Sequence, residues 1–406
     1  MLEKEFLEYG FSKEAYQKII NSLQLKRMNA TTLLKHFKEN NTYLEEFGYS
    51  KLDIIKIAKS YPSIYSCSVK NLKEKQEYLL SLAYTKENIF KMIKLVPSIL
   101  GLNIDSIKMR IEYLILLGYT RKNIFKMTKI LPTLYIYSID NIKQKIEDLI
   151  LLGYTKEEVL KMTILLPAIY SYSINSISKK INDLILLGYT KKDVIKMTKL
   201  SPSLFGRNIE VLKQRIDDLI LIGYSKKSIL RMTKLIPTLY TLSLTSIKQK
   251  INDLISLGYT KEDVIKMTEI APTIFGYSIE TIKRKFLDLI LLGFTKENVI
   301  KITKDLPAIY SSDLKSIKEK ISFYDAIGLH DIILINPKNL IQSVSLSYAR
   351  YKFYLDNGIN IDISNYKKIF VDQKQFENKY GLTKQELLEK YDYDEYLEGL
   401  KNARTL

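Results

Sequence analysis

The chain has 406 residues and carries 63 Lys and Arg against 45 Asp and Glu, a formal net charge of +18. Hydrophobic residues make up 46% of the chain, enough to bury a core, so the composition excludes wholesale disorder. A single cysteine, Cys67, excludes a disulfide framework, and the lack of any run of 18 apolar residues excludes a transmembrane helix.

Residues 1–48 are predicted to form an N-terminal capping unit. The segment from Gly10-Phe11-Ser12-Lys13 to Phe47-Gly48 has no proline, and its two glycines stand 38 residues apart (48 minus 10). We interpret it as one degenerate copy of the repeat that follows. The first six residues lack the basic and apolar regions of a secretory signal and do not resemble a transit peptide.

Residues 49–328 are predicted to form eight regular repeats of 35 residues. Eight of the nine prolines recur at this period without an insertion, and glycines keep the same period, with Ala83 filling the one gap. A fixed period of this length is typical of a solenoid, so the number of domains cannot be inferred from the length of the chain. The prolines are Pro62, Pro97, Pro132, Pro167, Pro202, Pro237, Pro272 and Pro307.

One repeat shows why the unit should be helix, proline turn, helix. Gly153 is predicted to end a helix in the left-handed conformation, and Thr155 to begin the next one in a capping box with Glu158. Pro167 cannot continue that helix, because its ring clashes and it has no N–H. A tight turn then leads to Ser173, the N-cap of the second helix. This cap position holds a capping residue in all eight repeats: Ser68, Asn103, Ser138, Ser173, Asn208, Ser243, Ser278 and Asp313.

Residues 329–406 are predicted to form an atypical C-terminal repeat and an acidic cap. Pro337 follows Pro307 by only 30 residues, and the segment from Tyr348 to Gly358 has the pattern of one more helix with a glycine stop. The tail from Leu382 onward is polar and acidic. Its acidic residues are Glu386, Glu389, Asp392, Asp394, Glu395 and Glu398.

The repeat resembles the motif of the mitochondrial transcription termination factor (mTERF) family. That motif has Leu-Gly, an aromatic residue and Ser or Thr before a short helix, then a proline turn, a polar cap and a second helix. One copy reads Leu186-Leu187-Gly188-Tyr189-Thr190, Ser201-Pro202-Ser203-Leu204-Phe205 and Asn208-Ile209. The end of the chain also matches, at Asn336-Pro337, Leu346-Ser347-Tyr348-Ala349-Arg350-Tyr351, Gly358, Phe370, Phe376 and Tyr380.

The resemblance covers about residues 45–391 and implies an all-α fold. The expected fold is a right- or left-curved α-solenoid of about eight to ten 35-residue repeats with a basic concave face. The resemblance further implies binding of duplex DNA or RNA in organellar gene expression. The expected compartment is the cytoplasm or nucleoid of a bacterium, or a mitochondrion or plastid if a presequence has been removed.

Three basic columns recur with the repeat, and we name each by its distance from the repeat proline. The −6 column is unbroken: Lys56, Lys91, Lys126, Lys161, Lys196, Arg231, Lys266 and Lys301. The +13 column is also unbroken: Lys75, Arg110, Lys145, Lys180, Arg215, Lys250, Lys285 and Lys320. The +11 column is interrupted only by Ser178: Lys73, Lys108, Lys143, Lys213, Lys248, Lys283 and Lys318.

Stacking of the repeats should turn each column into a ladder of charge. Packed helices lie about 8–10 Å apart, and each DNA strand presents a phosphate about every 3.4 Å, so one rung meets roughly every third phosphate. We predict that at least one of these ladders contacts phosphate. The alternatives are a merely solubilising outer surface and a lysine content that reflects an AT-rich genome.

The residues four and five positions after each proline vary, although their neighbours hardly change. The pairs are Ser66-Cys67, Gly101-Leu102, Ile136-Tyr137, Ser171-Tyr172, Gly206-Arg207, Thr241-Leu242, Gly276-Tyr277 and Ser311-Ser312. One hypothesis is that they line the groove and read bases or shape, with Arg207 reaching a guanine edge or a phosphate. The alternative is an exposed loop without a role.

Two aromatic columns, one after the glycines and one three residues after the prolines, are predicted to be core. Because Tyr, Phe and Leu replace one another there, we expect packing rather than the hydroxyl group to matter. Examples are Tyr119 and Phe294 in the first column, and Tyr170, Phe205 and Leu100 in the second.

Nothing in the sequence indicates catalysis. Polar residues repeat as columns of one type instead of converging as unlike groups, and every repeat glycine is expected to end a helix rather than to open a phosphate loop. His36 and His330 have no ligand-like spacing, so we expect no metal and no cofactor. No helix pairs a lysine-rich face with an exposed apolar one, which argues against membrane binding.

We therefore predict a monomeric, non-enzymatic protein without a small-molecule substrate. It is expected to bind nucleic acid in a basic groove, double-stranded DNA rather than RNA, and to regulate transcription or its termination. The alternatives are an RNA-binding factor and a solenoid scaffold that holds a protein or peptide.

Overall fold

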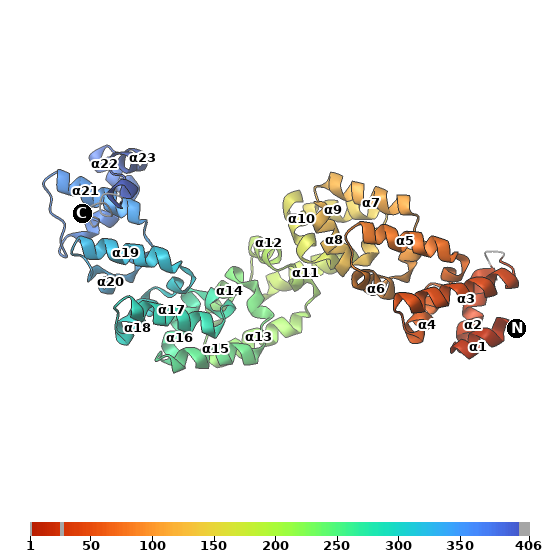
Figure 1. The fold of residues 1–406 in the computed structure, drawn as a ribbon. Helices are drawn as coiled ribbons and strands as arrows, with labels where there is room; N and C mark the ends of the chain where they lie inside the picture. The colour runs from red at the N-terminus through yellow and green to blue at the C-terminus, as the bar shows by residue number, and fades with distance from the viewer. Residues whose placement is uncertain (1, 25–27, 398–406) are drawn as a thin grey trace. The chain divides into compact units, whose positions relative to one another are not determined.

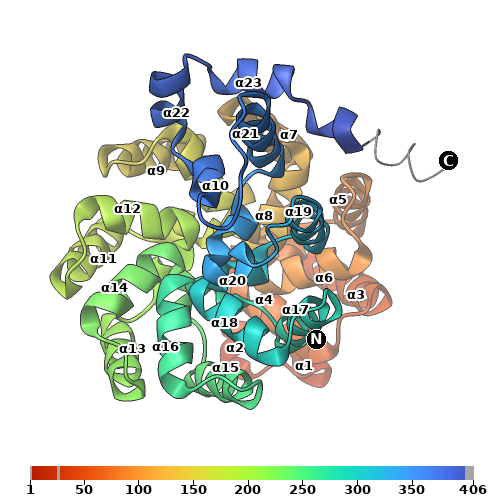
Figure 2. The same cartoon turned by 90° about the vertical axis from the view of Figure 1, so that its left-hand side faces the viewer.

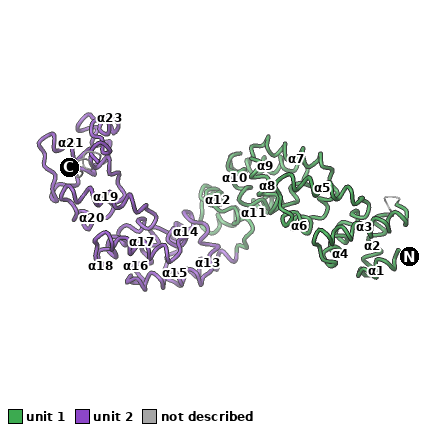
Figure 3. The backbone as a smooth tube through the Cα atoms, in the orientation of Figure 1, with its two compact units in different colours: residues 1–209 green, residues 210–406 purple. Residues whose placement is uncertain are grey.

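The computed structural model describes residues 2–24 and 28–397, and over these residues it contains 23 α-helices, ten 3-10 helices and no strand (Figure 1). Contacts divide the chain into two compact units, residues 1–209 and 210–406 (Figure 3). The boundary lies at the start of α13 (Ile209–Ile222), inside a regular repeat. It therefore differs from the division into 1–48, 49–328 and 329–406 that the repeat pattern predicts.

Each regular repeat consists of a first helix, a 3-10 helix that begins at the proline, and a second helix. The first helices are α4 (Lys51–Ser60), α6 (Lys86–Leu95), α8 (Arg121–Ile130), α10 (Lys156–Leu165), α12 (Lys191–Leu200), α14 (Lys226–Leu235), α16 (Lys261–Ile270) and α18 (Lys296–Asp305). The 3-10 helices are η1 (Pro62–Ser66), η2 (Pro97–Gly101), η3 (Pro132–Tyr135), η4 (Pro167–Ser171), η5 (Pro202–Gly206), η6 (Pro237–Tyr240), η7 (Pro272–Gly276) and η8 (Pro307–Ser311). The second helices are α5 (Val69–Ser81), α7 (Ile104–Leu117), α9 (Ile139–Leu151), α11 (Ile174–Leu187), α13, α15 (Leu244–Ser256), α17 (Ile279–Leu291) and α19 (Leu314–Ala326). The predicted all-α solenoid is confirmed.

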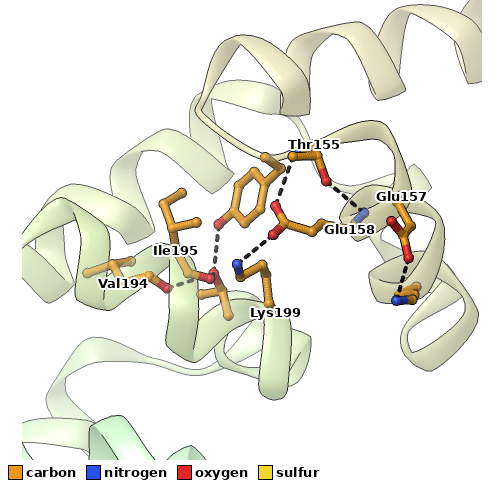
Figure 4. Close-up of polar contacts among 9 residues, drawn as sticks. Thr155, Glu157, Glu158, Val194, Ile195 and Lys199 are labelled. Atoms are coloured by element: carbon orange, nitrogen blue, oxygen red, sulfur yellow. Dashed lines mark hydrogen bonds and ion pairs between the residues drawn. The ribbon is translucent and has the colours of Figure 1, made fainter. Parts of the chain in front are cut away.

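Local capping explains where these helices begin and end. The Thr155 side chain accepts a hydrogen bond from the Glu158 N–H, and the Glu158 carboxylate accepts one from the Thr155 N–H, which completes the predicted capping box (Figure 4). Pro167 is the first residue of η4, so the predicted tight turn is a 3-10 helix of five residues. The predicted second N-caps accept a hydrogen bond from the first turn of their helices at Ser68, Asn103, Ser138, Ser173, Ser243, Ser278 and Asp313.

The helices of successive repeats stack in two layers. In unit 1 the first helix α10 contacts α8 and α12, and the second helix α11 contacts α9. In unit 2 the first helix α16 contacts α14 and α18. Figure 2 shows the two rows of unit 2, with α14, α16 and α18 in one and α13, α15 and α17 in the other. We call the row of first helices the first-helix layer.

Buried hydroxyl groups join successive repeats at Tyr84, Tyr119, Tyr154, Tyr224 and Tyr259, contrary to the expectation that the hydroxyls do not matter. The Tyr119 hydroxyl lies 2.5 Å from Thr163 Oγ1 and 2.7 Å from the Tyr170 hydroxyl, and both partners belong to the following repeat. Thr163 Oγ1 donates to the Val159 carbonyl at 2.9 Å, so it accepts from Tyr119, which in turn accepts from Tyr170. All three side chains are buried. Tyr84 and Tyr259 make the same pair of contacts with their own following repeats.

At one junction all three residues lack the hydroxyl. Phe294 corresponds to Tyr119, and the matching positions of the next repeat hold Ile333 and Leu340 instead of Thr and Tyr. At this junction the loss of the Tyr hydroxyl accompanies the loss of its partners, which avoids the free-energy cost of an unpaired buried hydroxyl. The exchange is not matched at every junction, because Tyr49 keeps its hydroxyl where the next repeat has Ile93 and Leu100. Phe205 and Phe275 likewise replace Tyr although Tyr154 and Tyr224 keep their hydroxyl groups.

The glycines that end the second helices adopt the left-handed conformation. Gly118 has φ 114°, and a Cβ added there would lie 3.0 Å from Leu160 Cδ1 of the next repeat, so both backbone and packing favour glycine. Ala83, which fills the gap in the glycine column, has φ 68° and is the one non-glycine residue with positive φ among those described.

We expect the substitution Ala83→Gly to stabilise the protein by about 1 kcal/mol, because a left-handed L-residue is strained by roughly 1–2 kcal/mol and glycine is not. A urea unfolding curve measures the change. The control is Glu77→Gly, which places glycine at an exposed position inside α5 and should lower the free energy of unfolding. A loss of stability in Ala83→Gly would contradict the strain argument.

The N-terminal segment closes the solenoid with aromatic side chains. Its helices are α1 (Leu2–Tyr9), α2 (Lys13–Gln24) and α3 (Ala30–Phe47), and α3 ends at Gly48 in the left-handed conformation. Phe6 is fully buried, with its ring 3.9 Å from Phe37 and 5.6 Å from Tyr65 of η1 (centroid distances). This cluster covers the apolar end of the first regular repeat.

The C-terminal segment is an atypical repeat followed by short helices. It contains α20 (Ile332–Ile335), η9 (Pro337–Ile341), α21 (Val344–Asp356), η10 (Tyr366–Phe370), α22 (Gln373–Tyr380) and α23 (Lys384–Lys390). The buried Arg350 guanidinium joins them by donating to the Ile369 carbonyl at 3.2 Å and to Gln373 Oε1 at 2.7 Å. Of the acidic tail, Glu398 lies outside the described residues.

Candidate nucleic-acid interface

The −6 column lies on the exposed side of the first-helix layer, and all eight of its cations are exposed. Lys91 and Lys161 form ion pairs of 2.7 Å with Glu87 and Glu157 one turn earlier, but these pairs are solvent-exposed and therefore weak. Among the described residues, Lys126, Lys196 and Lys266 form no ion pair. This column is available to an anionic partner in both units.

A fourth basic column, eleven residues before each proline, was not identified from the sequence pattern. This −11 column is unbroken and exposed: Lys51, Lys86, Arg121, Lys156, Lys191, Lys226, Lys261 and Lys296. Each of these residues is the first of its helix, where the helix dipole disfavours a cation. In six of the eight helices an acidic side chain in the same first turn offsets this cost, and only α8 and α14 have none. Counting residues backward from the prolines to the helix start would have found the column.

Ion pairs between successive first helices hold the layer in register. Lys199 Nζ lies 2.6 Å from the Glu158 carboxylate of the preceding repeat (Figure 4), and Lys94 and Lys304 form the same contact at 2.7 Å with Asp53 and Asp263. The hydrogen bond from Lys199 lowers the pKa of Glu158. These lysines form ion pairs between repeats. In the −6 column, Arg231 also contacts the next repeat, by donating to the Glu269 carbonyl at 3.2 Å.

The +13 column occupies a different place from the one predicted for a phosphate-binding ladder. Its side chains are half-buried or buried, with Lys180 only 9% exposed. Lys285 Nζ donates to the Ser312 carbonyl of the next repeat at 2.6 Å. Equivalent bonds run from Lys145 to Tyr172 and from Lys250 to Tyr277, and Lys75 donates to a carbonyl two residues earlier in its next repeat, that of Leu100.

Burial lowers the pKa of several members of this column, which are Arg110, Lys145, Lys180, Lys250 and Lys320. Arg215 lies 3.6 Å from Asp218 on its own helix. The geometry therefore gives the +13 column a role in joining repeats, and its contact with phosphate stays a prediction.

The +11 column is exposed but shares its surface with acidic residues. Lys108 lies 3.2 Å from Asp105, Lys143 lies 3.9 Å from Glu147, and Lys213 lies 2.8 Å from Glu210. The second helices thus present both signs of charge, which is typical of a solvated helix face. The first helices also carry exposed acidic residues, such as Glu87 and Glu157. The −6 and −11 columns are nevertheless the stronger candidates for a polyanion, because both are unbroken whereas Ser178 interrupts the +11 column.

The variable residues lie where the 3-10 helix meets the second helix, beside shallow hollows between repeats. One hollow of about 460 Å³ is lined by Leu242, Lys250, Phe275 and Tyr277, among others. Packing explains part of the variation, because a Cβ on Gly206 would lie 2.7 Å from the hydroxyl oxygen of Tyr172. Arg207 is exposed, so its contact with a base or a phosphate stays a prediction.

Among residues 2–24 and 28–397, no group of three His, Cys, Asp or Glu side chains is placed to hold a metal ion. His330 contacts the Asp325 carboxylate, rather than its neighbour Asp331, and stacks on Phe294 with the ring centroids 5.5 Å apart. His36 Nδ1 lies 3.0 Å from the Tyr65 carbonyl. Both histidines therefore have structural partners.

These features define an α-solenoid of helix–proline turn–helix repeats whose first-helix layer is basic. The mTERF family model matches residues 3–176, 142–291 and 219–377, so the chain belongs to the mTERF family. Membership suggests nucleic-acid binding and a role related to transcription, in a family that is in general not enzymatic. A comparison with curated proteins gave no match.

Within the part of the chain that the structure describes, none of the helices combines the length and the hydrophobicity that crossing a membrane requires.

Proposed function

We propose that this protein binds double-stranded DNA along its first-helix layer and thereby regulates transcription or its termination, without chemistry of its own. The observation that carries the proposal is the pair of unbroken, exposed cation columns at −6 and −11 on one layer. Family membership supports nucleic acid as the ligand.

The repeat geometry suits a uniform polyanion. Within a unit, successive first helices contact each other, as α8, α10 and α12 do in unit 1, so their cations recur about every 8–10 Å. This distance is close to the length of three phosphate steps of one DNA strand. Identical cations in every repeat read no base, which matches the backbone-positioning role of phosphate contacts. A regular duplex therefore fits better than a folded RNA with an irregular backbone. A compartment that contains DNA, such as a nucleoid or an organelle, follows from this proposal.

A competition experiment tests the choice of DNA. A labelled DNA duplex of about 30 base pairs is bound to the protein and displaced by unlabelled DNA duplex, RNA duplex or single strands of the same sequence. The proposal predicts that duplex DNA displaces the label at the lowest concentration. Displacement by RNA duplex or single-stranded RNA at a lower concentration would overturn the assignment to DNA and leave an RNA-binding factor.

A further inference from the structure

Large aliphatic side chains form an exposed column on the same first helices. They stand two residues before the proline, and we call them the −2 column. Its members are Leu95, Ile130, Leu165, Leu200, Leu235 and Ile270, and they are 50–65% exposed. Polar residues take this position in the repeats on either side, Ser60 before the column and Asp305 after it. The column is therefore an apolar strip of four side chains in unit 1, from Leu95 to Leu200, and of two in unit 2, Leu235 and Ile270.

The strip is adjacent to the −6 column, contrary to the expectation that no helix pairs a lysine-rich face with an exposed apolar one. Each −2 residue follows its −6 cation by four residues, so the two lie one turn apart on one helix face, separated by about 6 Å along the axis. In unit 1, Ile130 follows Lys126 and Leu200 follows Lys196, and all four side chains are exposed. A contiguous exposed apolar strip on a soluble protein marks a surface that binds something.

Duplex DNA does not account for this strip. A duplex offers the first-helix layer phosphates and sugars. The cations can bind the phosphates, but the aliphatic side chains find no apolar surface to pack against. A ligand that matches both columns must present apolar side chains beside negative charges. An acidic, amphipathic protein helix has this chemistry.

We propose that the first-helix layer also binds an acidic amphipathic helix of a partner protein, which competes with DNA for the −6 cations. Only the competition with DNA rests on the proposed function. The binding of the partner helix rests on the exposed apolar strip, which was observed without reference to DNA. The −2 side chains contact the leucines of the partner, and the −6 cations contact its carboxylates.

The repeat spacing fits such a helix laid across the layer. Seven residues of an α-helix rise about 10.5 Å, close to the separation of about 8–10 Å between packed helices. A leucine at every seventh position therefore meets successive −2 residues, and a glutamate about one turn from each leucine meets the neighbouring −6 cation. The four rungs of unit 1, from Leu95 to Leu200, accommodate a helix of about 20–25 residues.

The test uses the full-length protein and a labelled peptide of about 25 residues with leucines in heptad register flanked by glutamates. The comparison peptide has the same composition in permuted order. The test variant is Ile130→Ser/Leu165→Ser/Leu200→Ser. The control variant is Leu116→Ser/Leu151→Ser/Leu186→Ser, which removes leucines that are 81–85% exposed on the second helices of the same unit.

We expect the wild type to bind the heptad peptide at least about tenfold more tightly than the permuted one, and unlabelled duplex DNA to displace it. The test variant should lose this preference and keep its affinity for duplex DNA, whereas the control variant should keep both. Equal binding of the two peptides, or equal losses in the two variants, would overturn the proposal.

Two further experiments sharpen the test. The first distinguishes a partner helix from a lipid surface. The second shows whether the partner-helix proposal or the DNA-binding proposal has failed. Binding of vesicles with about 30% phosphatidylglycerol, lost in the test variant while neither peptide binds, would replace the protein partner by a lipid surface. Peptide binding by a protein that fails to bind any nucleic acid would refute the proposed function and leave the partner helix in place.

Discussion

Replacing Lys126, Lys161 and Lys196 together by Gln should weaken duplex binding by about 10²–10³-fold at about 0.1 M salt. Each cation that contacts a phosphate releases about 0.9 counterion. Three lost contacts therefore release nearly three fewer counterions, and the binding constant depends on the salt concentration with an exponent smaller by nearly three. The same variant should therefore show a log–log salt slope that is less steep by about 3. Fluorescence anisotropy with a labelled duplex measures both quantities.

A variant with the same change in net charge on the other layer is the matched control. Lys108→Gln/Lys143→Gln/Lys213→Gln removes three exposed lysines of the +11 column, each of which lies beside an acidic residue. We expect its affinity to fall much less. Equal losses in the two variants would mean that net charge, and not the first-helix layer, governs binding.

Tyr119→Phe should destabilise the protein by about 1–3 kcal/mol, a large effect for removal of one oxygen atom. The substitution leaves the buried Tyr170 hydroxyl without its partner at 2.7 Å and takes from Thr163 the donor at 2.5 Å. Urea unfolding measures the change in free energy, and hydrogen exchange of the amides of α10 locates it at this junction.

The junction at Phe294, where all three hydroxyls are absent, suggests a rescue for this variant. Adding Thr163→Val and Tyr170→Phe to Tyr119→Phe removes all three hydroxyls, as Phe294, Ile333 and Leu340 do near the C-terminus. The triple variant should recover part of the lost stability, because replacing both partners of a buried hydrogen bond by apolar groups is close to neutral. A triple variant less stable than Tyr119→Phe by the sum of the single effects would show that the hydroxyls act independently.

The fold could be predicted closely from the sequence because its signals are local. Pro167 stops a helix wherever it stands, and the capping box of Thr155 and Glu158 requires only residues three apart. Each weak local signal then occurs in eight repeats, which makes its interpretation more certain. The 3-10 geometry of the proline turn was not predicted, because a short turn and a 3-10 helix share the same residues.

The candidate site could be predicted only in part, because burial depends on the neighbouring repeat. Lys285 and Lys301 both belong to unbroken basic columns, yet the first donates to a carbonyl of the next repeat and the second is exposed. The carbonyl that separates their roles lies 27 residues further along the chain, at Ser312. Comparing each column with the following repeat would have exposed the linked Tyr and Thr positions, but it would not have identified a backbone acceptor.

The most direct test of the central claim is a salt series on the wild-type protein with matched duplex DNA, single-stranded DNA and RNA. If one ladder of eight cations follows a duplex, the log–log slope should be roughly −7, with the tightest binding to duplex DNA. Weak binding to all three nucleic acids, even at low salt, would contradict the claim that the first-helix layer is a nucleic-acid interface.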